Sequence, residues 1–240
     1  AYQQWGAGCL PRLNGMFAFA LWDNNKRTLL LGRDRFGEKP LYIARSPKGL
    51  VFASEMKAIL AVRPELREAN RKAMYRYLSR GDLDLDHESF FAGIESLPGG
   101  HYLLLDHEGR GEPRRYWEPT ACEVPGNRAH AIERFREILF DSIRIRLRSD
   151  VPVGSSLSGG IDSSSIVSTI NAQKTVQWLH QKTFSARFHS KAHDEGKFIK
   201  VVTHRVEAET HEVWVEPEQF IDAFERLQYH QEEPMPSASP

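Results

Sequence analysis

The sequence has few cysteines, no net charge and no long apolar run. Only Cys9 and Cys122 are cysteines among 240 residues, which excludes a disulfide framework and fits a reducing cytoplasm. Thirty-two basic residues balance 32 acidic ones, so no strong field attracts nucleic acid or an anionic membrane. The longest apolar run, Met16 to Trp22, is far shorter than the ~20 residues that span a bilayer. We therefore expect a cytoplasmic protein with small-molecule partners, and neither nucleic acid nor membrane among them.

One stretch has the pattern of a strand, a glycine loop and the start of a helix. The run from Val151 to Leu157 reads as a strand, and Gly159 and Gly160 interrupt it. Asp162 then opens a serine-rich segment that caps an apolar helix. Glycines without a Cβ let backbone N–H groups reach a phosphate, and the first N–H groups of the helix face the same point. The stretch therefore predicts an anion site.

Side chains of this loop add donors and a carboxylate. The hydroxyls of Ser158, Ser163 and Ser164 can donate to phosphate oxygens. Asp162 can either cap the helix or hold a metal ion that bridges phosphates. A plain Gly/Ser turn with an Asp cap is the alternative interpretation, and it explains four or five such residues more easily than all seven.

Two common nucleotide and hydrolase loops are excluded by single residues. A Walker A loop needs Lys after its second glycine, but Gly160 and Ile161 follow Gly159 here. A nucleophile elbow centred on Ser158 needs glycine where Ser156 stands. The pattern Ser-Gly-Gly-x-Asp-Ser-Ser instead resembles the pyrophosphate loop of the N-type ATP pyrophosphatases, which cut ATP between its α and β phosphates.

The first half of the chain has the pattern of consecutive β-hairpins. Strands are expected at 15–22, 28–31, 41–44 and 50–53, followed by a helix at 55–60 that Ser54 caps. Consecutive hairpins favour an antiparallel sheet. By charge alone, the segment from Gly32 to Tyr42 between the hairpins is typical of a salt-bridged surface loop.

The second half has a different order of elements. Residues 118–127 contain two prolines and a glycine without apolar periodicity, which indicates an interdomain linker. A helix with one apolar stripe follows, carrying Ile132, Phe135, Ile138, Leu139, Ile143 and Leu147. Further strands at 183–188 and 211–215 complete a β-α-β order, which predicts a parallel sheet with phosphate chemistry at its strand ends.

Three blocks resemble glutamine-hydrolysing asparagine synthetases in content, order and spacing. They are Asn14-Gly-Met-Phe-Ala-Phe-Ala-Leu-Trp-Asp23, Gly32-Arg-Asp-Arg-Phe-Gly-Glu-Lys-Pro-Leu-Tyr42 and Phe52-Ala-Ser-Glu-Met-Lys-Ala-Ile-Leu60. The resemblance implies an α/β protein of two domains. Residues 1–120 would be the C-terminal half of a class II glutamine amidotransferase domain, with the antiparallel sheets of an N-terminal-nucleophile fold. Residues 121–240 would be the N-terminal half of an asparagine synthase ATP-pyrophosphatase domain with a parallel sheet.

The resemblance also implies a reaction and its site. In the family, glutamine supplies ammonia, ATP with Mg²⁺ adenylates aspartate, pyrophosphate leaves, and ammonia converts the adenylate to asparagine. By matching positions, the ATP-binding residues would be Leu157, Ser158, Gly159, Gly160, Asp162, Ser163 and Ser164, with the backbone of Ala186 near the adenine. Asp162 would hold the metal. The block from His230 to Pro234 resembles another family block, so Glu232 and Glu233 either bind substrate or form a solvated acidic turn.

Family residues that do not appear in the sequence limit these expectations. Position 1 is alanine, whereas the family's glutaminase nucleophile is an N-terminal cysteine, and the family's distal acidic block is not found. We therefore expect a fragment with no catalytic residue of its own, weak nucleotide binding and no amide synthesis. A related ligase for another carboxylate, of the β-lactam synthetase or surface-polysaccharide kind, and a non-catalytic derivative of the fold are alternatives. A homodimer is a further arrangement to consider.

Overall fold

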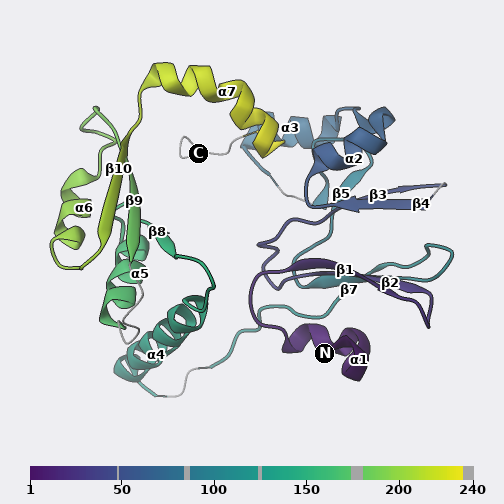
Figure 1. Ribbon diagram of the computed structural model, residues 1–240, viewed down its shortest axis with the longest axis horizontal. Helices are drawn as coiled ribbons and strands as arrows, with labels where there is room; N and C mark the ends of the chain where they lie inside the picture. Colours follow the sequence, from purple (N-terminus) through teal and green to yellow (C-terminus); the bar gives the residue numbers. More distant parts are fainter. Residues whose placement is uncertain (48, 84–86, 124–125, 174–180, 235–240) are drawn as a thin grey trace. The chain divides into compact units, whose positions relative to one another are not determined.

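The computed structural model describes residues 1–47, 49–83, 87–123, 126–173 and 181–234, and they form two compact units (Figure 1). The first unit contains Ala1–Ala121 together with residues 226–234, and the second contains Cys122–Glu225. Among the described residues, no helix combines the length and apolar character that a membrane crossing requires. Both cysteines are free thiols, with Cys9 buried and Cys122 exposed.

Two antiparallel sheets form the first unit. One has the strand order β1-β2-β6-β7 and the other has the order β4-β3-β5. The strands are β1 (Ala18–Asp23), β2 (Thr28–Arg33), β3 (Tyr42–Ser46), β4 (Gly49–Ala53), β5 (Ile94–Ser96), β6 (His101–Leu105) and β7 (Pro113–Arg115). The helices are α1 (Tyr2–Trp5), the 3-10 helices η1 (Gly6–Arg12) and η2 (Pro64–Leu66), α2 (Met56–Val62) and α3 (Arg71–Arg80). Both predicted hairpins are confirmed.

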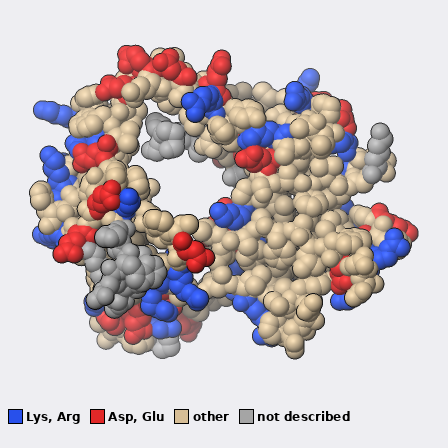
Figure 2. Space-filling view, viewed as in Figure 1, with Lys and Arg blue, Asp and Glu red and all other residues tan. Residues whose placement is uncertain are grey.

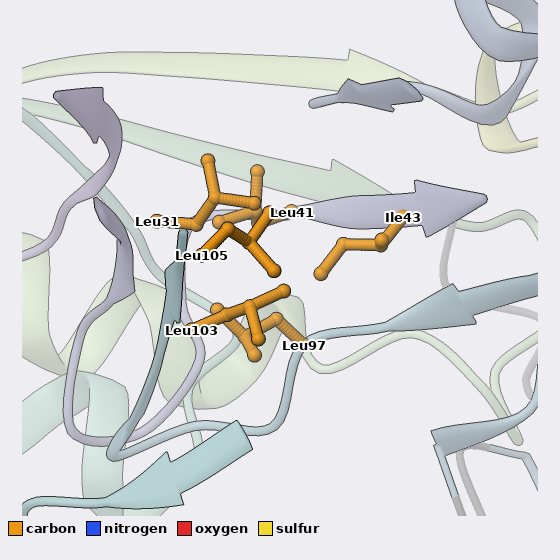
Figure 3. Close-up of a cluster of buried hydrophobic side chains, with 6 residues drawn as sticks. All are labelled: Leu31, Leu41, Ile43, Leu97, Leu103 and Leu105. Atoms are coloured by element: carbon orange, nitrogen blue, oxygen red, sulfur yellow. The ribbon is translucent and has the colours of Figure 1, made fainter. Parts of the chain in front are cut away.

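The two sheets of the first unit face one another across a leucine-rich core. Figure 3 shows side chains from β2 and β6 pointing toward those from the β3 side. Six buried residues make up this cluster: Leu31, Leu41, Ile43, Leu97, Leu103 and Leu105. A second cluster packs α2 against β3 and β5 through Ala44, Met56, Ile59, Leu60 and Ile94. A double layer of antiparallel sheets agrees with the predicted fold of this half.

The second unit is built around a parallel sheet. Its strand order is β10-β9-β8, so β9 lies in the middle and pairs in parallel with both neighbours. The elements are α4 (Arg128–Arg146), β8 (Gly154–Ser156), α5 (Ile161–Ala172), β9 (Lys182–Arg187), α6 (Gly196–Thr203), β10 (Glu209–Trp214) and α7 (Pro217–Gln231), of which α7 belongs to this unit only as far as Glu225. Leu157, Val167 and Ile199 form the buried core between the sheet, α5 and α6. The predicted α/β class with a parallel second sheet is confirmed.

The apolar stripe of α4 is less buried than its periodicity indicates. Ile143 is buried, but Ile132, Phe135 and Ile138 are each more than half exposed. Only the C-terminal half of α4 therefore contributes a buried residue, and in that half the Phe140 carbonyl accepts the side-chain amide of Gln173, at the end of α5, at 2.8 Å. The helix itself was predicted correctly, and the burial of its whole stripe was not.

The loop after β2 is held by backbone hydrogen bonds rather than by surface ion pairs. Asp34 is 1% exposed, and its carboxylate accepts N–H groups of Lys39 at 2.9 Å, Glu38 at 3.0 Å, Phe36 at 3.1 Å and Phe17 at 3.3 Å. Burial by itself would raise the pKa of Asp34, but these four donors outweigh burial and lower it. The prediction of a salt-bridged surface loop was wrong for this carboxylate.

Arg33 completes the same loop from the neighbouring position. Its guanidinium donates to the carbonyl oxygens of Lys39 at 2.7 Å, Gly37 at 2.7 Å and Leu97 at 2.6 Å. Tyr116 donates its hydroxyl to the Arg33 carbonyl at 2.8 Å, and burial raises the pKa of Tyr116 to about 12. The loop thus joins the end of β2 to segments that are remote in sequence.

Asp34→Asn is expected to lower the free energy of unfolding by about 3 kcal/mol, because an amide cannot accept four backbone donors. Since the pKa of Asp34 falls on folding, its charge stabilises the native state above about pH 4, and this contribution is lost as the pH falls further. Urea unfolding followed by tryptophan fluorescence measures both effects.

The matched control is Asp106→Asn. Asp106 also accepts backbone N–H groups, from Glu108 and Arg110 at 2.9 Å each, but in an exposed hairpin turn. We expect a loss under about 1 kcal/mol for this variant. Equal losses for the two variants would contradict the special role given to the buried carboxylate.

Candidate functional site

The predicted anion loop begins where β8 enters the core. Leu157 is 1% exposed, and its backbone N–H donates to the Phe184 carbonyl on β9 at 2.8 Å. Its own carbonyl accepts the Ser185 hydroxyl at 2.7 Å. Leu157 therefore anchors the loop to the central strand, and the chain leaves the sheet immediately after it.

The two glycines differ in what they require of the loop. Gly159 has φ +88°, a backbone region that favours glycine, and a Cβ built there would lie 2.8 Å from the Phe198 Cβ and 3.1 Å from the Ile199 nitrogen of α6. Gly160 has φ −67°, and a Cβ there would meet only the Ser158 hydroxyl at 3.4 Å. Gly159 is thus required by both conformation and space, and Gly160 by neither.

Serine hydroxyls tie the loop to the first turn of α5. The Ser163 Oγ accepts the Ser158 N–H at 3.3 Å and lies 3.1 Å from the Ser158 Oγ. The Ser158 Oγ in turn accepts the Gly160 N–H at 3.3 Å. These bonds are long and mostly exposed, so the same donors can turn to an anion that enters the loop.

Asp162 lies inside the first turn of α5 instead of capping it. The helix begins at Ile161 with Gly160 as its N-cap residue, which has no side chain to form a cap, and the Ser164 N–H already donates to the Gly160 carbonyl at 3.0 Å. The prediction that the Asp-Ser-Ser-Ser cluster caps this helix was therefore wrong. Asp162 is exposed at the N-terminus of α5. Its negative charge there interacts favourably with the positive end of the helix dipole.

Ala186 lies on the same edge of the sheet as the loop. It pairs with Val213 of β10, two residues beyond the Phe184 carbonyl that binds Leu157. The carboxyl ends of parallel strands meet at one edge, and ligands of α/β sheets bind there. The structure thus brings Ala186 and the loop to one edge, as the sequence predicts.

Glu232 lies in the first unit, where it bonds to the N-terminus of α2. Its carboxylate accepts the N–H groups of Met56 at 2.7 Å and Lys57 at 2.6 Å, and Lys57 Nζ lies 3.4 Å from it. The prediction that Ser54 caps this helix was wrong. Helix α2 begins at Met56, its N-cap residue is Glu55, and its first N–H groups donate to Glu232. Substrate binding by Glu232 and Glu233 stays a prediction.

Two charged residues near the loop were missed as functional candidates. Arg187 ends β9 as a buried residue, and Asp194 precedes α6 and binds its guanidinium at 2.8 and 3.0 Å. The hydrogen bond to Arg187 holds the pKa of Asp194 at about 2. An acidic residue close after the second strand was the available signal, but its arginine partner cannot be identified from spacing.

The charges of the second unit are mixed in sign. Figure 2 shows Lys and Arg interspersed with Asp and Glu, with acidic side chains gathered over α7. Among the described residues, no group of three or more His, Cys, Asp or Glu side chains is arranged to hold a metal ion. Asp162 is the carboxylate of the loop that could hold a cation together with oxygens of a bound phosphate.

The loop can bind an anion because backbone N–H groups and hydroxyls are already placed around it. Gly160 carries no side chain, α5 presents the N–H groups of a 12-residue helix, and the hydroxyls of Ser158 and Ser163 lie beside them. This arrangement can hold a polyphosphate. Gly160 and Ile161 stand where a Walker A loop has its lysine, and the groups of this loop can bind and orient a polyphosphate.

Family models match both parts of the chain. A glutamine amidotransferase domain model matches residues 1–117, and an asparagine synthase model matches residues 134–240. The two matches leave residues 118–133 between them, and the second begins inside α4. The division of the chain at residues 120 and 121 stays a prediction.

Relatives match over almost the whole chain. Asparagine synthetase 1 of Bacillus subtilis, a glutamine-hydrolysing enzyme by name, is 30% identical over 100% of this chain and 37% of its own length. A Methanocaldococcus jannaschii protein named provisionally as a glutamine-hydrolysing asparagine synthetase is 32% identical over 97% of this chain and 45% of its own. Amidase chyE of Penicillium rubens is 30% identical over 98% of this chain and 36% of its own length. The chain therefore spans less than half the length of these relatives.

Gly159→Ala is expected to destabilise the second unit by about 2 kcal/mol, since the new methyl group combines a left-handed backbone with a contact on α6. Gly160→Ala is the matched control and should cost under about 0.5 kcal/mol. Thermal unfolding of both variants measures the difference. A tolerated Gly159→Ala would show that α6 does not pack against this loop.

Glu232→Ala is expected to lower the free energy of unfolding of the first unit by about 1 to 2 kcal/mol, because two N–H groups of α2 lose their acceptor. Glu55→Ala serves as the control, since Glu55 only forms an exposed ion pair with Lys57. Hydrogen exchange of the α2 amides should rise in the first variant alone. Unchanged exchange there would contradict the cap.

Proposed function

Because this chain belongs to the family of glutamine-hydrolysing asparagine synthetases, we propose that the protein converts aspartate to asparagine at the expense of ATP. The aspartate side-chain carboxylate attacks the α-phosphorus of ATP, forming β-aspartyl-AMP and releasing pyrophosphate. Glutamine and water give glutamate and ammonia, and ammonia displaces AMP to form the amide. The carboxylate needs this activation because it is a poor electrophile at neutral pH.

The observation that carries this proposal is the phosphate loop on the parallel sheet. The loop lies between β8 and α5, and a left-handed Gly159 stands at its centre. Leu157, Ser158, Gly159, Gly160, Ser163 and Ser164 would hold the triphosphate, and the backbone of Ala186 would lie beside the adenine. In this arrangement the pyrophosphate remains bound by N–H and hydroxyl donors as it leaves.

Asp162 would hold Mg²⁺ at this loop. Its exposed carboxylate leaves both oxygens available to a hydrated cation that also contacts phosphate. The ion would neutralise charge on the triphosphate and on the departing pyrophosphate. Cytoplasmic location belongs to the same proposal, because ATP, aspartate and glutamine are cytoplasmic metabolites, and a homodimer stays a prediction.

A second acceptor is the main competing proposal. Relatives named as amidases match this chain about as well as the synthetases do, at 30% identity over 98% of its length. The same loop would then activate a different carboxylate by the same chemistry. The two proposals share the nucleotide site and differ only in the acceptor.

A pyrophosphate-release assay on the full-length protein, with ATP, Mg²⁺ and a panel of carboxylates, tests both proposals. We expect release that depends on aspartate, and asparagine once glutamine is added. Release with another carboxylate alone would favour the second proposal. No pyrophosphate release with any of the carboxylates would overturn both proposals.

Asp162→Asn is expected to lower pyrophosphate release about 10- to 100-fold, because the amide is a weaker ligand for Mg²⁺. Asp150→Asn is the matched control, an exposed aspartate in the same unit just before the loop, and should leave the rate unchanged. Raising Mg²⁺ should partly restore the first variant. Equal rates for both variants would contradict the metal role of Asp162.

A further inference from the structure

The guanidinium of Arg187 contacts two carboxylates and an indole ring. Its Nε and Nη2 donate to Asp194 at 2.8 and 3.0 Å, and its Nη1 donates to Glu212 at 2.6 Å. Its guanidinium carbon lies 4.6 Å from the ring centroid of Trp214. The residue is 7% exposed, so this planar fork is fixed at the end of the central strand.

Asp194 joins the end of β9 to the start of α6. Besides Arg187, its carboxylate accepts the Phe188 N–H at 3.3 Å and the N–H of Gly196, the first residue of α6. The guanidinium lies directly on Gly196, where a Cβ would approach Nη2 to 2.1 Å. The position of the helix is therefore set by the ion pair and by the absence of a side chain at 196.

The helix held in this way forms the wall behind the phosphate loop. The space beside Gly159 is closed by Phe198 and Ile199 of α6 and by the Glu195 carbonyl that precedes it. Ile199 also joins the buried cluster with Leu157 and Val167, on either side of the loop. A movement of α6 thus changes the room for Gly159, and a movement of Arg187 also shifts the adjacent Ala186.

We propose that Arg187 and Asp194 are positioning residues for the nucleotide, which fix α6 and through it the conformation of the Gly159 loop. This inference rests on the proposed nucleotide site. Neither residue needs to touch ATP. Their effect should appear in how tightly the nucleotide is bound and in how ordered the loop is before the nucleotide arrives.

The chain offers a control pair on the same two strands. Lys182 at the start of β9 and Glu209 at the start of β10 form an ion pair of 3.2 Å. This pair lies at the opposite end of the strands from Arg187. Breaking either pair removes one ionic contact between β9 and its surroundings, but only the Arg187 pair reaches α6 and the loop.

The test compares Asp194→Asn, Arg187→Lys and Glu209→Gln in the full-length protein. The KM for ATP is measured by pyrophosphate release, and hydrogen exchange of the amides of residues 158–160 is measured without nucleotide. We expect Asp194→Asn to raise the KM for ATP about 10-fold or more with kcat little changed, and to speed exchange in the loop. Arg187→Lys, which keeps the charge without the fork, should shift both in the same direction by less.

Glu209→Gln should leave both quantities at the wild-type value. If Asp194→Asn and Arg187→Lys lower the melting temperature but leave the KM for ATP and the loop exchange unchanged, the pair is only structural and the inference is overturned. If Asp194→Asn fails to fold, the KM for ATP and the loop exchange of Arg187→Lys decide between the two outcomes.

Failure of the proposed function gives a different result. A wild-type protein that does not bind Mg²⁺-ATP would overturn the nucleotide site, and with it the claim about ATP. The exchange measurement, which uses no nucleotide, would still report whether the pair controls the loop. Normal ATP binding with an unaltered loop in both variants would overturn the inference alone.

Discussion

Hydrogen bonds from backbone N–H groups to a carboxylate are the interaction on which both units depend. In the first unit Asp34 collects four such donors and fixes the loop that follows β2. In the second unit Asp194 collects donors from the end of β9 and the start of α6. A carboxylate can accept several donors at once, so one side chain can organise segments that share no regular hydrogen-bond ladder.

The helices, the strands and the glycine loop between β8 and α5 followed from local patterns. Each strand, helix and turn, the glycine loop included, depends on residues within about ten positions of one another, where turn chemistry and apolar period decide the outcome. Gly159 needed its left-handed backbone for the same local reason. The resemblance of three blocks to one family then gave the loop a reaction, which periodicity alone does not supply.

The parts that sequence could not give are contacts over long separations. The acceptor for the donors of α2 is Glu232, which lies 176 positions from Met56, so the nearby Ser54 was chosen wrongly. Arg187 likewise pairs with Glu212, 25 positions away, and no spacing rule selects this partner. The apolar period of α4 marked a helix correctly, but period alone does not say which of its residues another element covers.

The close approach of Arg187 to Gly196 limits the order in which substitutions can be accepted. A side chain at 196 would overlap the guanidinium as long as Arg187 is seated, so glycine is held there by its neighbour and not by its own backbone. Replacement of Arg187 by a small residue would free position 196, and a later bulky residue at 196 would then block the return of arginine. Positions 187 and 196 thus form an epistatic pair, because the residue that one position accepts depends on the residue present at the other.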